Sequence, residues 1–348
     1  MQKLRLLILA IAFYGLQPTV AIAQNHVERL FYYIDEERSL ESLRANIGKI
    51  DVVAPGVYNV DEDGIVWGGV DPRVLALAAE HDVAVMPLLV NPGFDQEMLS
   101  SLLNSEEARA RALESFLFEC RKHNYAGMQF DFENLGIKDK DAFTLFFIET
   151  AAAFHAEDLK LSIAVVHRPE NSPGPTRYFK WLFKNWRAGY DLPALAEVAD
   201  FISVMTYSQH TRRTTPGPNA GIPWMIENIE YFLESVPAEK LSLGIAVTSQ
   251  HWSTEQGDQY VANARSWSKS LSHSEAMSVA ERFSADWIWL DDQKVAYSFF
   301  SNGGLFEWVF LEDARSFEQK LDLVKRYGLR GFSVWVIGYE DPGIWDLF

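Results

Sequence analysis

One ten-residue stretch dominates the sequence: residues 125–134 read YAGMQFDFEN. From residue 128 onward, apolar side chains alternate with the polar side chains of Gln129, Asp131 and Glu133. Alternation of period two is typical of a β-strand, and it places the three polar side chains on one face. The neighbouring apolar residues indicate a buried strand, where two carboxylates are costly unless they have a role. Acids two residues apart lie within about 7 Å along a strand, so each raises the proton affinity of the other and one can serve as a general acid.

The rest of the chain alternates strand-like and helical patterns. Seven further apolar runs have the composition of buried strands: residues 30–34, 50–55, 83–90, 159–166, 201–207, 241–247 and 331–336. Helical patterns separate them, at residues 40–47, 72–81, 105–123, 142–154, 192–198, 222–233 and 317–327. Eight strands separated by helices predict an α/β protein with the (β/α)8 TIM barrel fold. A doubly wound parallel sheet is the alternative, but no Gly-rich turn follows the first strand.

The regular spacing breaks once, between the seventh strand and the last helix. About 65 residues lie there, far more than a loop normally contains. They include a helical pattern at 274–282 and three strand-like pieces, of which the last two flank the turn sequence Asn302-Gly303-Gly304. We therefore expect a small α+β insertion subdomain over residues 249–313, inside one catalytic domain that spans 24–348.

The N-terminus has the pattern of a secretory signal peptide over residues 1–23. A basic start precedes the apolar run 6–15, and a small-x-small cleavage site ends at Ala23. A transmembrane anchor is the alternative, but Gln17 and Pro18 interrupt the apolar run too early. We expect the mature protein to be secreted or periplasmic.

Composition excludes several other functions. The net charge is −17, and −19 after removal of a leader with two basic and no acidic residues, which argues against nucleic acid as a partner. Cys120 is the single cysteine, so no intramolecular disulfide is expected. No later segment is apolar enough to span a membrane, and no metal-binding, phosphate-binding or Gly-x-Ser-x-Gly motif occurs. We expect no metal, no cofactor and a monomer. His167 and His210 follow strands and either line a pocket or have a structural role at its rim.

The acidic stretch resembles the D-x-x-D-x-D-x-E signature of glycoside hydrolase family 18, the chitinase-like enzymes. Asp131 and Glu133 match its last two acids, whereas Ala126 and Gln129 stand where the family usually has Asp. The variant Phe-Asp-Phe-Glu-Asn is similar to a bacterial subgroup that includes spore-cortex and cell-wall N-acetylglucosaminidases.

Three further segments carry the same resemblance, which covers about residues 28 to 348. They are Met205-Thr206-Tyr207 at the end of the sixth strand, the stretch 307–314, and the stretch 330–342 with Trp335. The Gly/Pro-rich loop 216–224 is similar to the same bacterial subgroup, and we expect it on the catalytic face of the barrel.

The resemblance implies a retaining, substrate-assisted hydrolysis of N-acetylglucosamine-containing glycans. Glu133 would be the general acid, Asp131 would stabilise the acetamido group, and Tyr207 would hold its carbonyl oxygen. The resemblance also implies substrate-binding residues: Gln129, Met205, Trp335 and Tyr32. We further expect the Gln129 amide to donate a hydrogen bond to Asp131, which would stay ionised over most of the working pH range.

Two questions stay open from the sequence. The polymer could be chitin, peptidoglycan or the chitobiose core of N-glycans, and the cleavage could be endo or exo. A catalytically weak or inactive carbohydrate-binding lectin is the alternative function, because family members that lose the acid bind sugars without cutting them.

Overall fold

A computed structural model describes residues 26–211, 214–255 and 266–348 of the chain. The expected signal peptide lies outside the described residues, as does the part of the expected insertion at 256–265.

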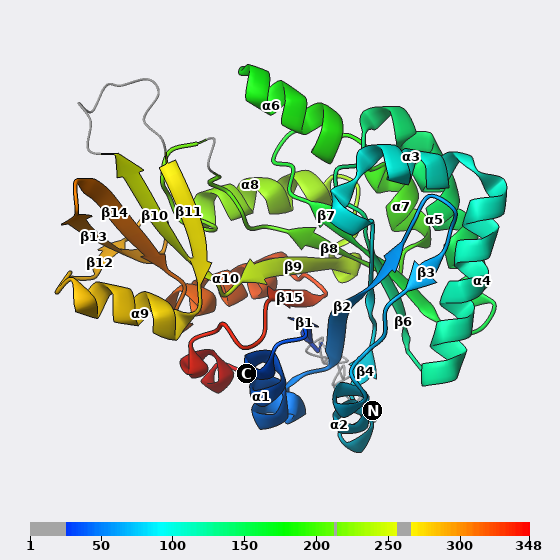
Figure 1. The fold of residues 1–348 in the computed structure, drawn as a ribbon, viewed down its shortest axis with the longest axis horizontal. Helices are drawn as coiled ribbons and strands as arrows, with labels where there is room; N and C mark the ends of the chain where they lie inside the picture. Colours follow the sequence, from blue (N-terminus) through cyan, green and yellow to red (C-terminus); the bar gives the residue numbers. More distant parts are fainter. Residues whose placement is uncertain (1–25, 212–213, 256–265) are drawn as a thin grey trace, which may run out of the picture.

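The core of the molecule is a closed barrel of eight parallel strands (Figure 1). In chain order the strands are β1 (Glu28–Tyr33), β2 (Val52–Val60), β4 (Ala84–Val85) with β5 (Leu88–Val90), β6 (Gly127–Asp131), β7 (Lys160–Val166), β8 (Phe201–Met205), β9 (Leu241–Ala246) and β15 (Gly331–Trp335). Each strand pairs with the next, and β1 closes the ring by pairing with both β2 and β15. The third strand comes in two pieces because Pro87, between them, has no N–H to donate. The prediction of a (β/α)8 barrel is confirmed.

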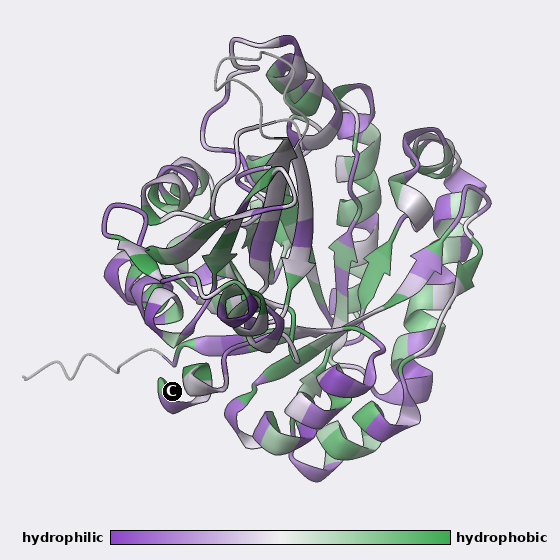
Figure 2. Cartoon of the chain, turned by 60° about the vertical axis from the view of Figure 1, so that its left-hand side comes forward, coloured by the Kyte–Doolittle hydropathy of each residue, from purple (hydrophilic) through white to green (hydrophobic). Residues whose placement is uncertain are grey.

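Helices surround the barrel, and hydrophobic residues concentrate on the strands and the helix faces turned toward them (Figure 2). These helices are α1 (Glu37–Asn46), α2 (Pro72–Glu80), α3 (Gln96–Asn104), α4 (Glu106–His123), α5 (Lys140–His155), α6 (Arg177–Leu182), which continues as the π-helix η4 (Phe183–Arg187), α7 (Leu192–Val198), α8 (Ile222–Leu233) and α10 (Ala314–Tyr327). Local sequence fixes their ends. Ser105 caps the N-terminus of α4 by accepting from the Ala108 N–H, and Asn124 ends it in a left-handed conformation.

The alternation in β6 separates two environments. The apolar side chains Phe130 and Phe132 face outward, and Phe130 packs edge-on against Phe116 of α4 and Phe147 of α5. The polar side chains face the barrel interior, where Gln129 bonds to groups on three other strands. The predicted assignment of faces is therefore confirmed.

A second sheet follows β9 in the chain and lies to one side of the barrel in Figure 1. It is antiparallel, with the order β11-β10-β14-β13-β12. Its strands are β10 (Ser249–Glu255), β11 (Ser266–Leu271), β12 (Ile288–Leu290), β13 (Val295–Asn302) and β14 (Leu305–Leu311). The helix α9 (His273–Arg282) lies between β11 and β12 in the chain. Helix α9 covers one face, with Phe283 after its end stacked on Phe300 at 4.3 Å. The other face meets the loop after β8, where Trp252 Nε1 donates to Gly217 O at 2.9 Å.

The sequence reasoning missed α3, the α6–η4 helix, the short strand β3 (Val66–Trp67) and the strands β10 and β11 of the second sheet. The segment 177–187 places aromatic and basic side chains all round the helix, so it shows no apolar stripe. Within the described ranges, no helix combines the length and apolarity needed to cross a membrane.

Candidate active site

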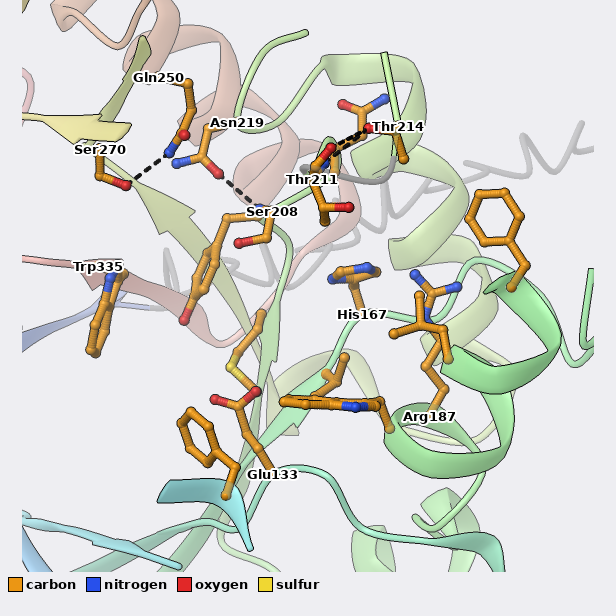
Figure 3. A pocket seen from close by; sticks show the side chains of 18 of the residues that line it. Glu133, His167, Arg187, Ser208, Thr211, Thr214, Asn219, Gln250, Ser270 and Trp335 are labelled. Atoms are coloured by element: carbon orange, nitrogen blue, oxygen red, sulfur yellow. Dashed lines mark hydrogen bonds between the residues drawn. The ribbon is translucent and has the colours of Figure 1, made fainter. Parts of the chain in front are cut away.

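A pocket of about 590 Å³ opens at the carboxyl ends of the barrel strands (Figure 3). Asp131, Val166, Met205 and Trp335 are the last residues of β6, β7, β8 and β15, and all four line it. Parallel strands of a barrel end at one face, so residues far apart in sequence meet there.

The structure brings five of the seven predicted site residues together in this pocket: Asp131, Glu133, Met205, Tyr207 and Trp335. Gln129 and Tyr32 do not line the pocket. They are 1% and 2% exposed, and they lie deeper in the barrel than the residues that end the strands.

The two acids lie close together at the end of β6, with Asp131 buried and Glu133 half-buried. Asp131 is 8% exposed, and among the described residues no group donates to its Oδ1. Burial raises the pKa of Asp131 well above its ordinary value, because charge is costly away from water. Burial also raises the pKa of Glu133, and the negative charge of Asp131 raises it further. This shift is opposite to the predicted one, because desolvation outweighs the missing neighbouring charge, so Asp131 is ionised only above its raised pKa. The negative charge of Asp131 raises the pKa of Glu133 in the predicted direction.

The hydrogen bonds of Gln129 differ from the prediction. Its Oε1 accepts from the Tyr32 hydroxyl at 2.8 Å, and its Nε2 donates to Ser162 Oγ at 3.0 Å and Ser203 Oγ at 3.3 Å. The amide therefore joins β1, β7 and β8, and the expected bond to Asp131 is wrong. The cause is geometric: side chains on one strand point parallel to each other, whereas those on facing strands converge inside the barrel.

Asn91 was not predicted, yet it holds the backbone of Glu133. Its Nδ2 donates to Glu133 O at 2.9 Å, and its Oδ1 accepts from Glu133 N at 3.0 Å. The Tyr190 hydroxyl donates to the preceding carbonyl, Phe132 O, at 2.8 Å. Asn91 directly follows β5, so two adjacent strand ends fix the position from which Glu133 projects. A polar residue directly after an apolar strand was the only available sequence signal.

Tyr207 is held by close packing. A Cβ at Gly244 of β9 would lie 2.3 Å from Val204 O and 3.1 Å from Tyr207 Cε1, so only glycine leaves room there. Burial raises the pKa of Tyr207, and its hydroxyl keeps its proton and can donate. Asn219, in the predicted loop 216–224, accepts from Ser208 N at 2.8 Å and donates to Thr248 O at 3.1 Å.

The antiparallel sheet and the α6–η4 helix complete the walls. Gln250 of β10 and Ser270 of β11 line the pocket and bond to each other at 3.1 Å. On another side the helix contributes aromatic residues and Arg187. Sequence reasoning missed this wall, although a cluster of aromatic and basic residues in an acidic chain was a usable signal.

The two histidines have different places. His167 lines the pocket, and burial together with the nearby Arg187 charge lowers the pKa of His167 to about 3, so the imidazole is neutral. His210 is not among the described residues that line the pocket, and its Nδ1 lies 2.9 Å from Thr215 O.

In a (β/α)8 barrel, paired acids and aromatic side chains at the carboxyl ends of the strands are typical of a carbohydrate-cleaving enzyme. The chain belongs to the glycosyl hydrolases family 18, whose family model matches residues 29–340, and it is a glycoside hydrolase.

Known proteins resemble the chain over most of its length. It is 30% identical over 263 residues to the cortical fragment-lytic enzyme of Bacillus subtilis, covering 74% of this chain and 57% of that protein. It is 21% identical over 319 residues to the uncharacterized glycosylase YvbX of the same organism, covering 90% and 88%. A solved chitinase from Chromobacterium violaceum matches with a TM-score of 0.81 at 24% identity, covering 92% and 97%, and shares the fold.

Proposed function

We propose that this glycoside hydrolase cleaves β-1,4-linked glycans that contain N-acetylglucosamine, with retention of configuration and participation of the substrate's own acetamido group. The names of similar proteins, a cortical fragment-lytic enzyme and a chitinase, support glycans of the peptidoglycan or chitin class.

One observation carries the proposal for the mechanism. Among the described residues that line the pocket, the acids are Asp131 and Glu133, and both project from the end of the same strand. A retaining mechanism needs a nucleophile on the face of the sugar opposite the general acid. No described carboxylate occupies the facing wall, whereas an acetamido oxygen of the substrate can reach the anomeric carbon.

The proposed reaction has two steps. Glu133 donates its proton to the glycosidic oxygen while the acetamido oxygen attacks the anomeric carbon, which breaks the glycosidic bond and forms an oxazolinium ion. Asp131, ionised at this stage, accepts a hydrogen bond from the acetamido N–H and stabilises the positive charge, and Tyr207 donates to the acetamido oxygen. Water then attacks the anomeric carbon and gives a proton to Glu133, while the bond between that carbon and the acetamido oxygen breaks and restores the acetamido group.

The environment of each residue fits its proposed role. The raised pKa keeps Glu133 protonated toward neutral pH, as a general acid requires. The unpartnered Oδ1 of Asp131 can accept from the substrate. Trp335 offers a ring face to a sugar, and its own ring packs against Tyr32 with centroids 5.7 Å apart. Met205 is proposed to contact the same sugar, whereas buried Gln129 and Tyr32 are proposed to support the pocket from below.

Removal of the acetyl group from the substrate tests the proposed mechanism. We expect cleavage of an N-acetylglucosamine oligosaccharide and no cleavage next to a deacetylated ring, because the nucleophile is then absent. A thiazoline analogue of the oxazolinium ion should inhibit. Product release is followed by mass spectrometry, and equal cleavage of acetylated and deacetylated bonds would indicate a protein nucleophile.

Turnover separates this proposal from the carbohydrate-binding lectin. We expect the parent protein to release reducing ends, and Glu133→Gln to bind the same oligosaccharide while its kcat is lower by several orders of magnitude. Binding without products in the parent would favour the lectin. Product lengths in the same experiment distinguish endo from exo cleavage.

We also propose that the protein is exported after removal of residues 1–23 and acts as a monomer. The acetamido glycans in question lie outside the cytoplasm in cell walls and chitin, which fits the leader pattern.

A further inference from the structure

Arg187 is an unusual residue for this pocket. It lies at the end of the η4 helix, lines the pocket, and among the described residues forms no ion pair. Its Nε is buried and has no hydrogen-bond partner. Three other buried or half-buried arginines of this acidic chain have carboxylate partners: Arg29 with Asp51, Arg109 with Glu149, and Arg330 with Glu28.

The surroundings of Arg187 do not neutralise its charge. The neighbouring Arg168 donates to the backbone carbonyl of Arg187 at 3.2 Å, and its guanidinium lies over the ring of Tyr231 at 4.9 Å. Burial lowers the pKa of Arg187 to about 10, and the charge of Arg168 contributes in the same direction. A guanidinium in this position stays charged at neutral pH, and an anionic group of the ligand would stabilise its charge.

The position of Arg187 relates it to the proposed catalytic residues. Arg187 and Trp335 lie on opposite sides of the pocket that contains Glu133 (Figure 3). The aromatic side chains Phe179, Trp181 and Trp186 line the pocket on the same helix as Arg187. A sugar ring above Trp335 would therefore have its neighbouring ring within this aromatic and cationic part of the pocket.

We propose that Arg187 forms an anion subsite, and that the substrate is an amino-sugar glycan with a carboxylate on the ring next to the N-acetylglucosamine above Trp335. This inference rests on the proposed function, of which it specifies the substrate class. A carboxylate matches the planar guanidinium in a bidentate pair. The acids Asp131 and Glu133 would otherwise disfavour a negatively charged substrate, so Arg187 is the group that makes one acceptable.

The test compares two glycans that differ only in charge. One is a peptide-free strand of alternating N-acetylglucosamine and N-acetylmuramic acid, and the other is the same strand with its carboxylates reduced to alcohols. We expect the parent to prefer the carboxylate strand by about 10- to 100-fold in kcat/KM, the range of a charge-assisted pair. In Arg187→Met this ratio should fall to about one, and Arg187→Lys should lie between, because it keeps the charge and loses the planar fork.

Lys184→Met is the matched control. Lys184 is an exposed cation on the same helix and is not among the described residues that line the pocket. Its loss changes the net charge by the same amount, so the ratio should stay at the parental value. Melting temperatures check that each variant folds.

The outcomes separate the two proposals. A parental ratio near one, or a ratio that Arg187→Met leaves unchanged, overturns the anion subsite while hydrolysis of both strands leaves the proposed function intact. If the parent cuts neither strand but cuts an N-acetylglucosamine oligosaccharide, the anion subsite is overturned and the proposed function stands. If it cuts none of the three, the proposed function fails, and the calorimetric affinities of the two charged and reduced strands for the same variants test the subsite by the same ratios.

Discussion

At the scale of single residues, Gln129 shows how the barrel interior tolerates a departure from the family pattern. The amide uses its oxygen and both N–H groups on Tyr32, Ser162 and Ser203, so it is satisfied without an acid at this position. Asp131 therefore has no second carboxyl below it, and its raised pKa comes from burial alone. The coupling that remains is between Asp131 and Glu133.

A carboxylate at position 129 should change this balance. In Gln129→Asp the hydroxyls of Tyr32, Ser162 and Ser203 can donate to the new group, so we expect a folded and active enzyme. Its negative charge would raise the pKa of Asp131, which the proposed reaction needs ionised, so the acidic limb of the pH profile should move to higher pH. We would measure kcat/KM against pH on a chitobiose-based substrate. Gln319→Asp on α10 adds the same charge away from the pocket and should leave the profile unchanged. Superimposable profiles for parent and Gln129→Asp would show that position 129 is not coupled to the acids.

At the scale of elements, the end of β5 positions the end of β6. Asn91 is 1% exposed and satisfies both backbone groups of Glu133, which lies two residues beyond the last residue of β6. Paired backbone bonds to one side chain restrict both the position and the rotation of that peptide. Asn91 is thus a positioning residue in our proposal.

Asn91→Ala should lower kcat by about 10- to 100-fold with a small change in KM, because misplacing the acid by a fraction of an ångström affects the reaction more than binding. The rate is expressed per site that binds the thiazoline inhibitor, which removes any loss of folded protein from the comparison. Asn104→Ala, which removes hydrogen bonds of a similar kind from α3, serves as the control and should keep the parental rate. Equal kcat per binding site in Asn91→Ala and the parent would rule out the positioning role.

At the scale of the whole molecule, the two acids of the pocket affect the stability of the fold. The folded state binds protons at Asp131 and Glu133 more tightly than the unfolded chain, because the pKa of each carboxyl is raised. Such groups stabilise the fold below their ordinary pKa values of about 4, and that stability is lost as the pH rises through the raised values. The free energy of unfolding therefore contains a contribution that falls from acidic toward neutral and alkaline pH.

The double variant Asp131→Asn/Glu133→Gln removes this contribution. We expect it to melt above the parent, with a difference that grows by several degrees between about pH 5 and about pH 8. Other titrating groups are shared by the two proteins and cancel in the difference. Glu114→Gln, an exposed position on α4, should show no such pH dependence. A melting difference that stays constant with pH would mean that the acids ionise freely in the folded protein.

The sequence by itself determined the barrel and the strand that carries the acids. Those features depend on local periodicity: apolar runs separated by helical patterns, and the period-two alternation that assigns Gln129, Asp131 and Glu133 to one face. It also indicated that Tyr207 and Trp335 would lie at strand ends, where the pocket is.

Only the tertiary structure decided which groups contact one another. Asn91 reaches Glu133 because neighbouring strands end side by side, and Gln129 bonds to residues as distant in sequence as Tyr32 and Ser203 because a closed barrel brings facing strands together. The raised pKa values follow from desolvation, which depends on the packing of the whole domain. The α6–η4 wall with Arg187 has no periodic signal, since its side chains serve the pocket and the surface together.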